Sequence, residues 1–277
     1  MSGPTTISID KFARLIGTHT CPAVIDVRTP EDFAADPRLI PGSIRHAHAD
    51  VADWAPAWQG RNAIVVCQKG LKLSQGVAAW LRHAGAEAEN LDGGFAAWAA
   101  AGQSLVPAAL IPSRDALGRT LWVTRARPKV DRIACPWLIR RFIDPLAVFL
   151  FVSPPEVAAV ADRFGATPFD IEGPGVFWSH RGEDCTFDVM LAEWGLGAVP
   201  GLAHLATIVR GADTARPDLA PEAAGLLAAS LGLSRIFGDD LAQLDAGMVL
   251  YDAFWRWCRD ATNETHNWTS HTPRVGK

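Results

Sequence analysis

The segment AIVVCQKGLKLS, residues 63–74, joins an apolar run to a cysteine, a glycine and two lysines. The apolar run has the length and composition of a strand buried on both faces of a parallel sheet. Residues 75–83 follow with the spacing of an amphipathic helix, and Gly85 is placed to end that helix in a left-handed conformation. Ligands bind at the carboxyl ends of strands in such sheets, and Cys67 lies at this end.

Cys67 has the surroundings of a reactive thiol. A thiol is a strong nucleophile only as its thiolate, and loop amides together with a helix N-terminus favour that charge. Lys69 and Lys72 add positive charge to the same loop. The alternative is a cysteine that only ends a core strand, since free cysteine is among the most buried residue types. The glycine and the two lysines favour the first interpretation.

The segment before this loop shows the same kind of pattern. Residues 23–27 form a second apolar run, which predicts another buried strand. Ser8 precedes a short helical pattern, and Pro41 and Gly42 form a turn before a further short strand. Short buried strands that alternate with helices indicate an α/β domain around a parallel sheet. We place this domain at residues 5–106.

The composition favours two domains and excludes several classes of protein. The 277 residues fit two domains of ordinary size, and 49% of them are apolar, which is enough for two cores. The net charge of −4 disfavours a nucleic-acid surface over the whole chain. No run approaches the roughly 20 apolar residues of a membrane span, and no secretory signal is visible. Five irregularly spaced cysteines suit a reducing compartment. We therefore expect a cytoplasmic protein that binds neither nucleic acid nor membrane.

The first domain resembles a single-domain rhodanese. The resemblance is carried, in order along the chain, by residues 26–33, residues 40–44, the Cys67 loop and residues 91–98. It implies a rhodanese-like parallel sheet flanked by helices, and a sulfurtransferase in which Cys67 carries a sulfane sulfur as a persulfide. The sulfur comes from thiosulfate or a persulfide donor and passes to a thiol acceptor, and the transfer requires no cofactor.

The same resemblance implies that the loop after the cysteine wraps the persulfide. We therefore predict substrate contacts by Gln68, Lys69, Gly70, Leu71 and Lys72, with Arg28 beside them.

Two residues depart from the commonest loop pattern. Lys72 stands where arginine is frequent, and Leu73 stands where a small residue is frequent. Lysine keeps the charge but loses the bidentate geometry of arginine, which leaves the choice of sulfur donor open. We interpret Asp26 and Arg28 as an ion pair that organises the strand end, with a role of Arg28 in tuning the pocket as the alternative.

A change of pattern separates the two halves of the chain. Residues 107–119 contain two prolines and little periodicity, and we interpret them as a linker. A second domain is expected over residues 120–268, followed by a tail over residues 269–277.

The second domain begins as α/β and becomes helical. We expect a strand over residues 120–124, a helix over residues 132–143 capped by Asp131, and a buried strand over residues 147–152. Further helices are expected at residues 187–194, 201–210, 221–231 and 239–259. These patterns predict a mostly helical α/β domain.

Positive charge is concentrated at the start of this domain. Between residues 113 and 141 the chain has eight arginines and lysines against two aspartates. Arg127, Lys129 and Arg132 lie near an expected helix N-terminus, where they favour binding of an oxyanion. The alternative is a basic face that pairs with acidic helices.

A group of polar residues later in the domain suggests a metal. His180, Glu183, Cys185 and Asp188 fall within nine residues, shortly after Asp170. Imidazole and carboxylate groups bind transition metals, so we predict a transition-metal ion held by Asp170, His180 and Asp188. The spacing matches no paired CxxC or HExxH signature. Helix capping and loop hydrogen bonds are therefore the alternative interpretation.

The second domain resembles the C-terminal domain of the chromate-resistance protein family. The resemblance is carried mainly by residues 125–142, with support from residues 167–170, 180–188, 209–213 and 251–253. It implies an association with chromate resistance and sensing. Chromate is a tetrahedral dianion like sulfate, which agrees with the concentrated arginines.

These observations lead to three hypotheses about function. The first is a sulfurtransferase whose persulfide chemistry serves chromate or oxyanion resistance. The second is a sensor or resistance protein that binds an oxyanion or metal through its second domain without turning over substrate. The third is reduction or oxidation of an oxyanion by Cys67 together with a metal.

Overall fold

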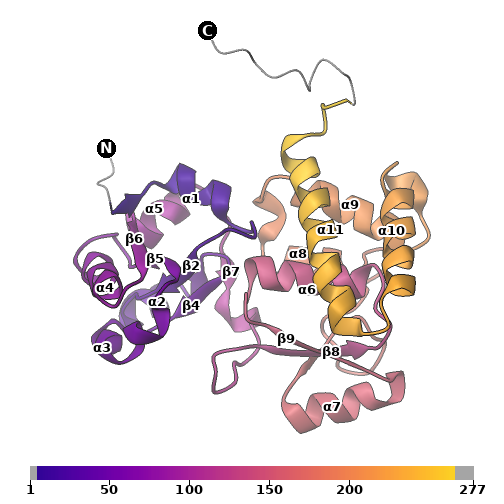
Figure 1. Ribbon diagram of the computed structural model, residues 1–277, viewed down its shortest axis with the longest axis horizontal. Coiled ribbons are helices and arrows are strands. Elements are labelled where there is room, and N and C mark those ends of the chain that lie inside the picture. Colours follow the sequence, from indigo (N-terminus) through magenta and orange to yellow (C-terminus); the bar gives the residue numbers. More distant parts are fainter. Residues whose placement is uncertain (1–4, 266–277) are drawn as a thin grey trace.

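The computed structural model describes residues 5–265, which form two domains that lie side by side along the longest axis (Figure 1). The first domain contains a five-stranded parallel sheet in the order β1-β6-β5-β2-β4. Its strands are β1 (Thr6–Ile7), β2 (Ala23–Asp26), β4 (Ser43–Arg45), β5 (Asn62–Val66) and β6 (Glu87–Leu91). Strand β5 is central in this sheet, and its carboxyl end leads directly into Cys67.

Helices cover both faces of this sheet because side chains along each strand alternate between the faces. Ile64 belongs to the apolar core that contains Phe12 and Trp98, whereas Val65 belongs to the core that contains Leu81. The first core is covered by α1 (Ile9–Leu15) and α5 (Gly94–Ala100), and the second by α3 (Val51–Trp54) and α4 (Lys72–His83). Helix α2 (Pro30–Ala35) follows β2.

The expected linker is fixed by contacts to both domains. Strand β3 (Arg38–Leu39) pairs antiparallel with β7 (Val106–Pro107), so the first residue assigned to the linker belongs to a strand. A single 3₁₀ turn at Ala108–Leu110 follows. The carbonyl of Leu110 accepts a hydrogen bond of 3.2 Å from the indole of Trp194 in the second domain.

The second domain is built on a three-stranded parallel sheet in the order β10-β8-β9. The strands are β8 (Leu121–Arg125), β9 (Val148–Val152) and β10 (Thr167–Pro168). Helix α7 (Val157–Phe164) packs on one face and α6 (Asp131–Phe142) on the other (Figure 1). The remaining helices are α8 (Thr186–Glu193), α9 (Leu202–Asp213), α10 (Ala223–Ile236) and α11 (Asp240–Asp260). The prediction of a mostly helical α/β domain is therefore confirmed.

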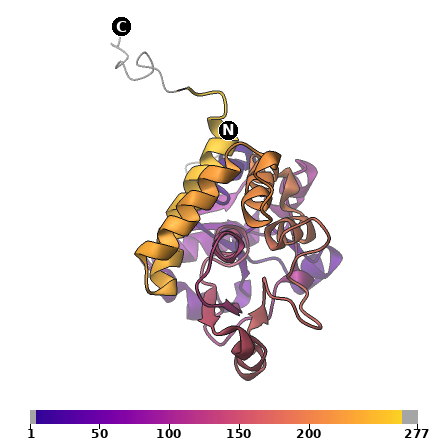
Figure 2. The same cartoon turned by 90° about the vertical axis from the view of Figure 1, so that its right-hand side faces the viewer.

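The two domains share one apolar core. Phe142, at the end of α6, is fully buried, and a side chain at Gly17 of the first domain would overlap its ring. The amide of Gly42 donates a hydrogen bond of 2.5 Å to the carbonyl of Phe142. Seen from the second domain, α11 and α10 lie in front of the first domain (Figure 2). The domain contact is thus made of packed side chains and main-chain hydrogen bonds.

One local prediction is wrong. Val130, with φ +23°, is the N-cap residue of α6, and Asp131 is the first helical residue instead of the cap. The carboxylate of Asp131 accepts a hydrogen bond of 3.2 Å from the amide of Phe187 on a different helix. The predicted tail, residues 269–277, lies outside the described residues. Within residues 5–265, no helix combines the length and apolar character needed to cross a membrane.

Candidate functional site

Cys67 lies at the carboxyl end of β5, and its side chain belongs to the core beneath α4. It is 4% exposed. Its thiol donates a hydrogen bond of 3.1 Å to the hydroxyl of Ser74 in the first turn of α4. That hydroxyl donates in turn to the carbonyl of Leu71 at 3.2 Å. A polar chain therefore connects the sulfur to the loop that follows it.

The carbonyls of the Cys67 loop, residues 67–72, accept hydrogen bonds from the end of β6 and the first turn of α5. The amides of Phe95 and Ala96 donate to the carbonyls of Cys67 and Gln68, both at 3.0 Å. The side chain of Asn90 donates to the carbonyl of Gly70 at 3.2 Å. With the carbonyls used in this way, the main-chain N–H groups of residues 68–72 have no acceptor among residues 5–265. Free consecutive amides next to a helix N-terminus form a binding site for an anion.

Glycines make this close contact sterically feasible. Gly70 has φ +67° and Gly94 has φ +62°. A Cβ at Gly94 would lie within 3.0 Å of the carbonyl oxygen of Cys67 and the amide nitrogen of Gly70. Because only glycine leaves this space free, the loop can adopt its path only against this particular turn.

Three of the predicted loop residues lie on the outside. Lys69, Leu71 and Lys72 are exposed, and Lys72 is the first residue of α4. Gln68 is half-buried, and its Oε1 atom is buried without a hydrogen-bond partner. The structure therefore brings the predicted residues of the Cys67 loop to one end of the sheet.

Arg28 has the structural role that we favoured for it. Its guanidinium is fully buried and forms an ion pair of 2.7 Å with Asp26. It also donates to the carbonyls of Asp36 and Arg38, and it lies 3.7 Å from the ring centroid of Phe95. Each of its guanidinium nitrogens is thereby engaged, so Arg28 offers no direct contact to a substrate.

The predicted oxyanion site does not assemble. The guanidinium of Arg127 donates to the carbonyls of Ser234, Phe237 and Gly238, and Arg132 lies 3.3 Å from Asp170. Lys129 is exposed. Other arginines of the basic segment form ion pairs with Asp144, Asp115, Asp245 and Asp252. This arrangement favours the alternative of a basic face that pairs with acidic side chains.

A second candidate site surrounds His180. Its Nε2 atom lies 3.3 Å from Asp170 Oδ1, 3.3 Å from Asp213 Oδ2 and 3.7 Å from Asp131 Oδ2. We call these four residues the His–Asp cluster. It borders an open cavity of about 720 Å³ that is lined also by Arg125, Arg132 and Glu172.

The groups of the His–Asp cluster shift one another's protonation. Burial, and then the charges of Asp213 and Asp170, raise the pKa of Asp131 well above its usual range. Burial also acts to raise the pKa of Asp170, but hydrogen bonds from His180 and Thr186 outweigh it and lower that pKa overall. Hydrogen bonds to Asp170 and Asp213 raise the pKa of His180 to about 10. Without a bound cation, the imidazole is therefore the positive charge at the centre of the cluster.

The structure brings together only two of the three predicted metal ligands. Asp170 and His180 lie together, but Asp188 lies elsewhere, because its carboxylate caps α8 at the amide of Cys185 and pairs with Arg210 at 3.4 Å. Sequence reasoning missed Asp131 and Asp213. Both lie in segments quoted for the family resemblance, which was the available signal.

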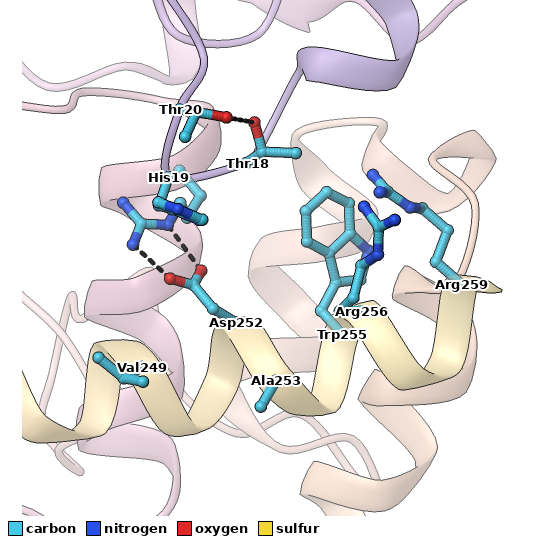
Figure 3. A pocket seen from close by; sticks show the side chains of 10 residues that line it. Thr18, His19, Thr20, Val249, Asp252, Ala253, Trp255, Arg256 and Arg259 are labelled. Carbon is cyan, nitrogen blue, oxygen red and sulfur yellow. Dashed lines mark hydrogen bonds and ion pairs between the residues drawn. The ribbon is translucent and has the colours of Figure 1, made fainter. Parts of the chain in front are cut away.

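A second cavity, of about 570 Å³, lies where the loop after α1 meets α11 (Figure 3). Thr18 and Thr20 line it on one side, and Asp252 and Trp255 on the other. Arg141 reaches in from α6 and donates two hydrogen bonds to Asp252, at 2.8 and 2.7 Å. Both residues belong to the second domain, so this neutral pair joins α6 to α11 beside the contact with the first domain.

Each half of the chain matches a known protein family. Residues 8–101 match the family described as rhodanese-like domain, and residues 122–258 match the family described as ChrB, C-terminal domain. Protein ChrB of Cupriavidus metallidurans is 40% identical over 144 residues, which cover 50% of this chain and 42% of that protein. The match therefore spans less than half of that relative's length.

Solved structures match the first domain. A rhodanese-like domain protein from Staphylococcus aureus is 25% identical, with a TM-score of 0.31, and covers 35% of this chain and 91% of its own. A thiosulfate sulfurtransferase from Pseudomonas aeruginosa is 24% identical, with a TM-score of 0.31, and covers 38% of this chain and 19% of its own. One assignment agrees with both family matches, with the parallel sheet and with the mostly helical second half. The chain joins a rhodanese-like domain to a ChrB C-terminal domain.

Proposed function

We propose that the chain is a sulfurtransferase in which Cys67 carries a persulfide. The Cys67 thiolate attacks the sulfane sulfur of thiosulfate or of a persulfide. A new S–S bond forms at Sγ, the S–S bond of the donor breaks, and sulfite or the donor thiolate leaves with the electron pair. A thiophilic acceptor then takes the outer sulfur, which restores the Cys67 thiolate. The observation that supports this proposal is the loop of free amides that begins at Cys67.

The surroundings of the sulfur favour small donors. Cys67 is 4% exposed, so a donor must bring its sulfane sulfur to an atom that is nearly covered. Thiosulfate and low-molecular-weight persulfides are small enough to do so. The Ser74 hydroxyl, 3.1 Å from the sulfur, can donate a hydrogen bond once the thiol has lost its proton.

Intact-mass spectrometry after treatment with thiosulfate tests the proposal. We expect a gain of one sulfur, about 32 Da, that is lost on adding dithiothreitol. The gain should be absent in Cys67→Ser and retained in Cys21→Ser, a control that removes a partly exposed free thiol. A thiosulfate:cyanide assay should show the same difference. Equal sulfur uptake by wild type and Cys67→Ser would contradict the assignment.

The second domain connects this chemistry to oxyanion tolerance. Its similarity to ChrB supports the proposal that sulfur transfer serves resistance to chromate or a related oxyanion. The alternative is a non-catalytic sensor that binds an oxyanion or metal, and the His–Asp cluster beside an open cavity favours it. Expression of the wild-type protein and of Cys67→Ser in a chromate-sensitive bacterium separates the enzyme from the sensor. Tolerance that survives Cys67→Ser would favour the sensor, and tolerance lost with the thiol would favour the enzyme.

A further inference from the structure

The His–Asp cluster gathers more acceptors around one nitrogen than a single proton can satisfy. Asp131 opens α6, Asp170 follows β10, His180 lies in the loop before α8, and Asp213 ends α9. Three carboxylates therefore lie within 3.7 Å of His180 Nε2. That atom carries at most one N–H group.

Positive side chains are distributed unevenly over the three carboxylates of the His–Asp cluster. Both arginines of the cavity, Arg125 and Arg132, approach Asp170, at 3.9 and 3.3 Å. Within residues 5–265, Asp131 and Asp213 have ion-pair contact with His180 alone. Carboxylates this close together repel unless one of them takes up a proton or a further cation lies between them.

Asp131 supplies an independent sign of a missing partner. The residue is completely buried, and its Oδ1 atom has no hydrogen-bond partner among the described residues. Its other oxygen, Oδ2, accepts from the amide of Phe187 and lies 3.7 Å from His180 Nε2. A buried carboxylate oxygen without a partner is costly in a protein interior, and a bound cation removes that cost.

The spacing of the ligand atoms fits a metal ion. One ligand atom each from Asp131, Asp170 and His180 can be chosen so that all lie within 4.8 Å of one another. Metal–ligand bonds of about 2.0–2.2 Å in tetrahedral geometry place ligand atoms roughly 3.3–3.6 Å apart. The observed separations from Nε2 to the oxygens of Asp170 and Asp131, 3.3 and 3.7 Å, lie close to this range.

We propose that Asp131, Asp170 and His180 bind a divalent transition-metal ion at the edge of the cavity. Two carboxylates and one imidazole suit Mn²⁺, Fe²⁺ or Zn²⁺ and disfavour soft ions such as Cu⁺. Three protein ligands leave coordination positions for water or an exogenous ligand, as in catalytic sites. These positions adjoin Arg125 and Arg132, so an anion bound to the metal there would also meet two guanidinium groups.

Calorimetry with the full chain tests this site, with MnCl₂ as the main probe because Mn²⁺ binds thiolates weakly. After dialysis against EDTA, we expect saturable binding of one Mn²⁺ per chain and a higher melting temperature. Asp170→Asn and His180→Ala should each weaken the affinity by at least about tenfold. Glu172→Gln removes a carboxylate that lines the same cavity outside the proposed ligand set, and it should change the affinity less than twofold.

Asp131→Asn separates metal binding from folding. The asparagine side chain keeps an oxygen for the amide of Phe187 and cannot become the charged carboxylate that binds a metal ion. In metal-free protein we therefore expect an unchanged or higher melting temperature, while the stabilisation by Mn²⁺ is lost. Absence of saturable binding of both Mn²⁺ and Zn²⁺, or an equal loss in Glu172→Gln, would show that the cluster is only an imidazolium hydrogen-bonded to carboxylates.

Discussion

The substitution Gly94→Ala tests whether the turn between β6 and α5 shapes the Cys67 loop. At φ +62° an alanine loses about 1–2 kcal/mol relative to glycine. Its Cβ would also lie within 3.0 Å of the Cys67 carbonyl oxygen and the Gly70 amide nitrogen, both main-chain atoms. Relief of such overlap costs roughly another 1–3 kcal/mol. We therefore expect a total destabilisation of about 2–5 kcal/mol, which lowers the melting temperature by roughly 4–20 °C.

Gly102→Ala is the matched control for this prediction. Gly102 has a similar φ, +67°, and a Cβ there would meet nothing within 4 Å. This variant loses only the conformational part, about 1–2 kcal/mol. The difference between the two variants therefore measures the overlap with the loop.

Thermal unfolding and the rate of persulfide formation from thiosulfate measure the two consequences. Gly94→Ala should have a clearly lower melting temperature than Gly102→Ala. Its folded fraction should form the persulfide at least about tenfold more slowly, because a misplaced catalytic group lowers the reaction rate by factors of this size. Equal melting temperatures for the two variants would refute the steric argument. A destabilised Gly94→Ala with an unchanged rate would show that the path of the loop does not control the sulfur.

Three further predictions concern single side chains. Ser74→Ala removes the hydroxyl beside the sulfur and should slow persulfide formation several-fold at a stability loss of about 1 kcal/mol, whereas Ser74→Thr should retain most of the rate. Phe142→Ala leaves a cavity in the shared core and should lower the free energy of unfolding of the whole chain by about 3–5 kcal/mol in urea titrations, with a single transition. Burial lowers the pKa of His46 below its usual 6.5. The folded state therefore loses stability as the pH falls through 6.5, because the unfolded chain then binds a proton more readily than the folded chain does. Melting curves between pH 5 and 7.5 should accordingly show a weaker pH dependence for His46→Gln than for wild type.

Much of the first domain could be predicted because its signals are local. The strand, the Cys67 loop and the helix after it form one uninterrupted segment, residues 62–83, and the apolar run identifies the strand. The sequence does not predict strand β6, because its residues EAENL alternate polar and small side chains without a strong apolar signal. Its buried Asn90, which binds the carbonyl of Gly70, is therefore visible only in the folded chain.

The His–Asp cluster was harder to predict because its residues are distant in sequence. Asp131 and Asp213 are 82 residues apart, and short spacing rules cannot connect them. An aspartate before a helical pattern is usually an N-cap, which led to the wrong role for Asp131. Asp188 is close to His180 in sequence, but its place in the first turn of α8 commits it to capping.

Helix α6 extends from the His–Asp cluster to the first domain. Its first residue, Asp131, belongs to the His–Asp cluster, and its last residue, Phe142, packs against the first domain. The twelve residues of this helix span about 18 Å, at 1.5 Å for each residue. Because the core is continuous across this helix, a cation that binds only the folded second domain stabilises the contact with the first domain as well. The rhodanese-like domain and the ChrB C-terminal domain should therefore melt in a single transition. Mn²⁺ should raise the temperature of that transition, instead of raising only one of two separate transitions.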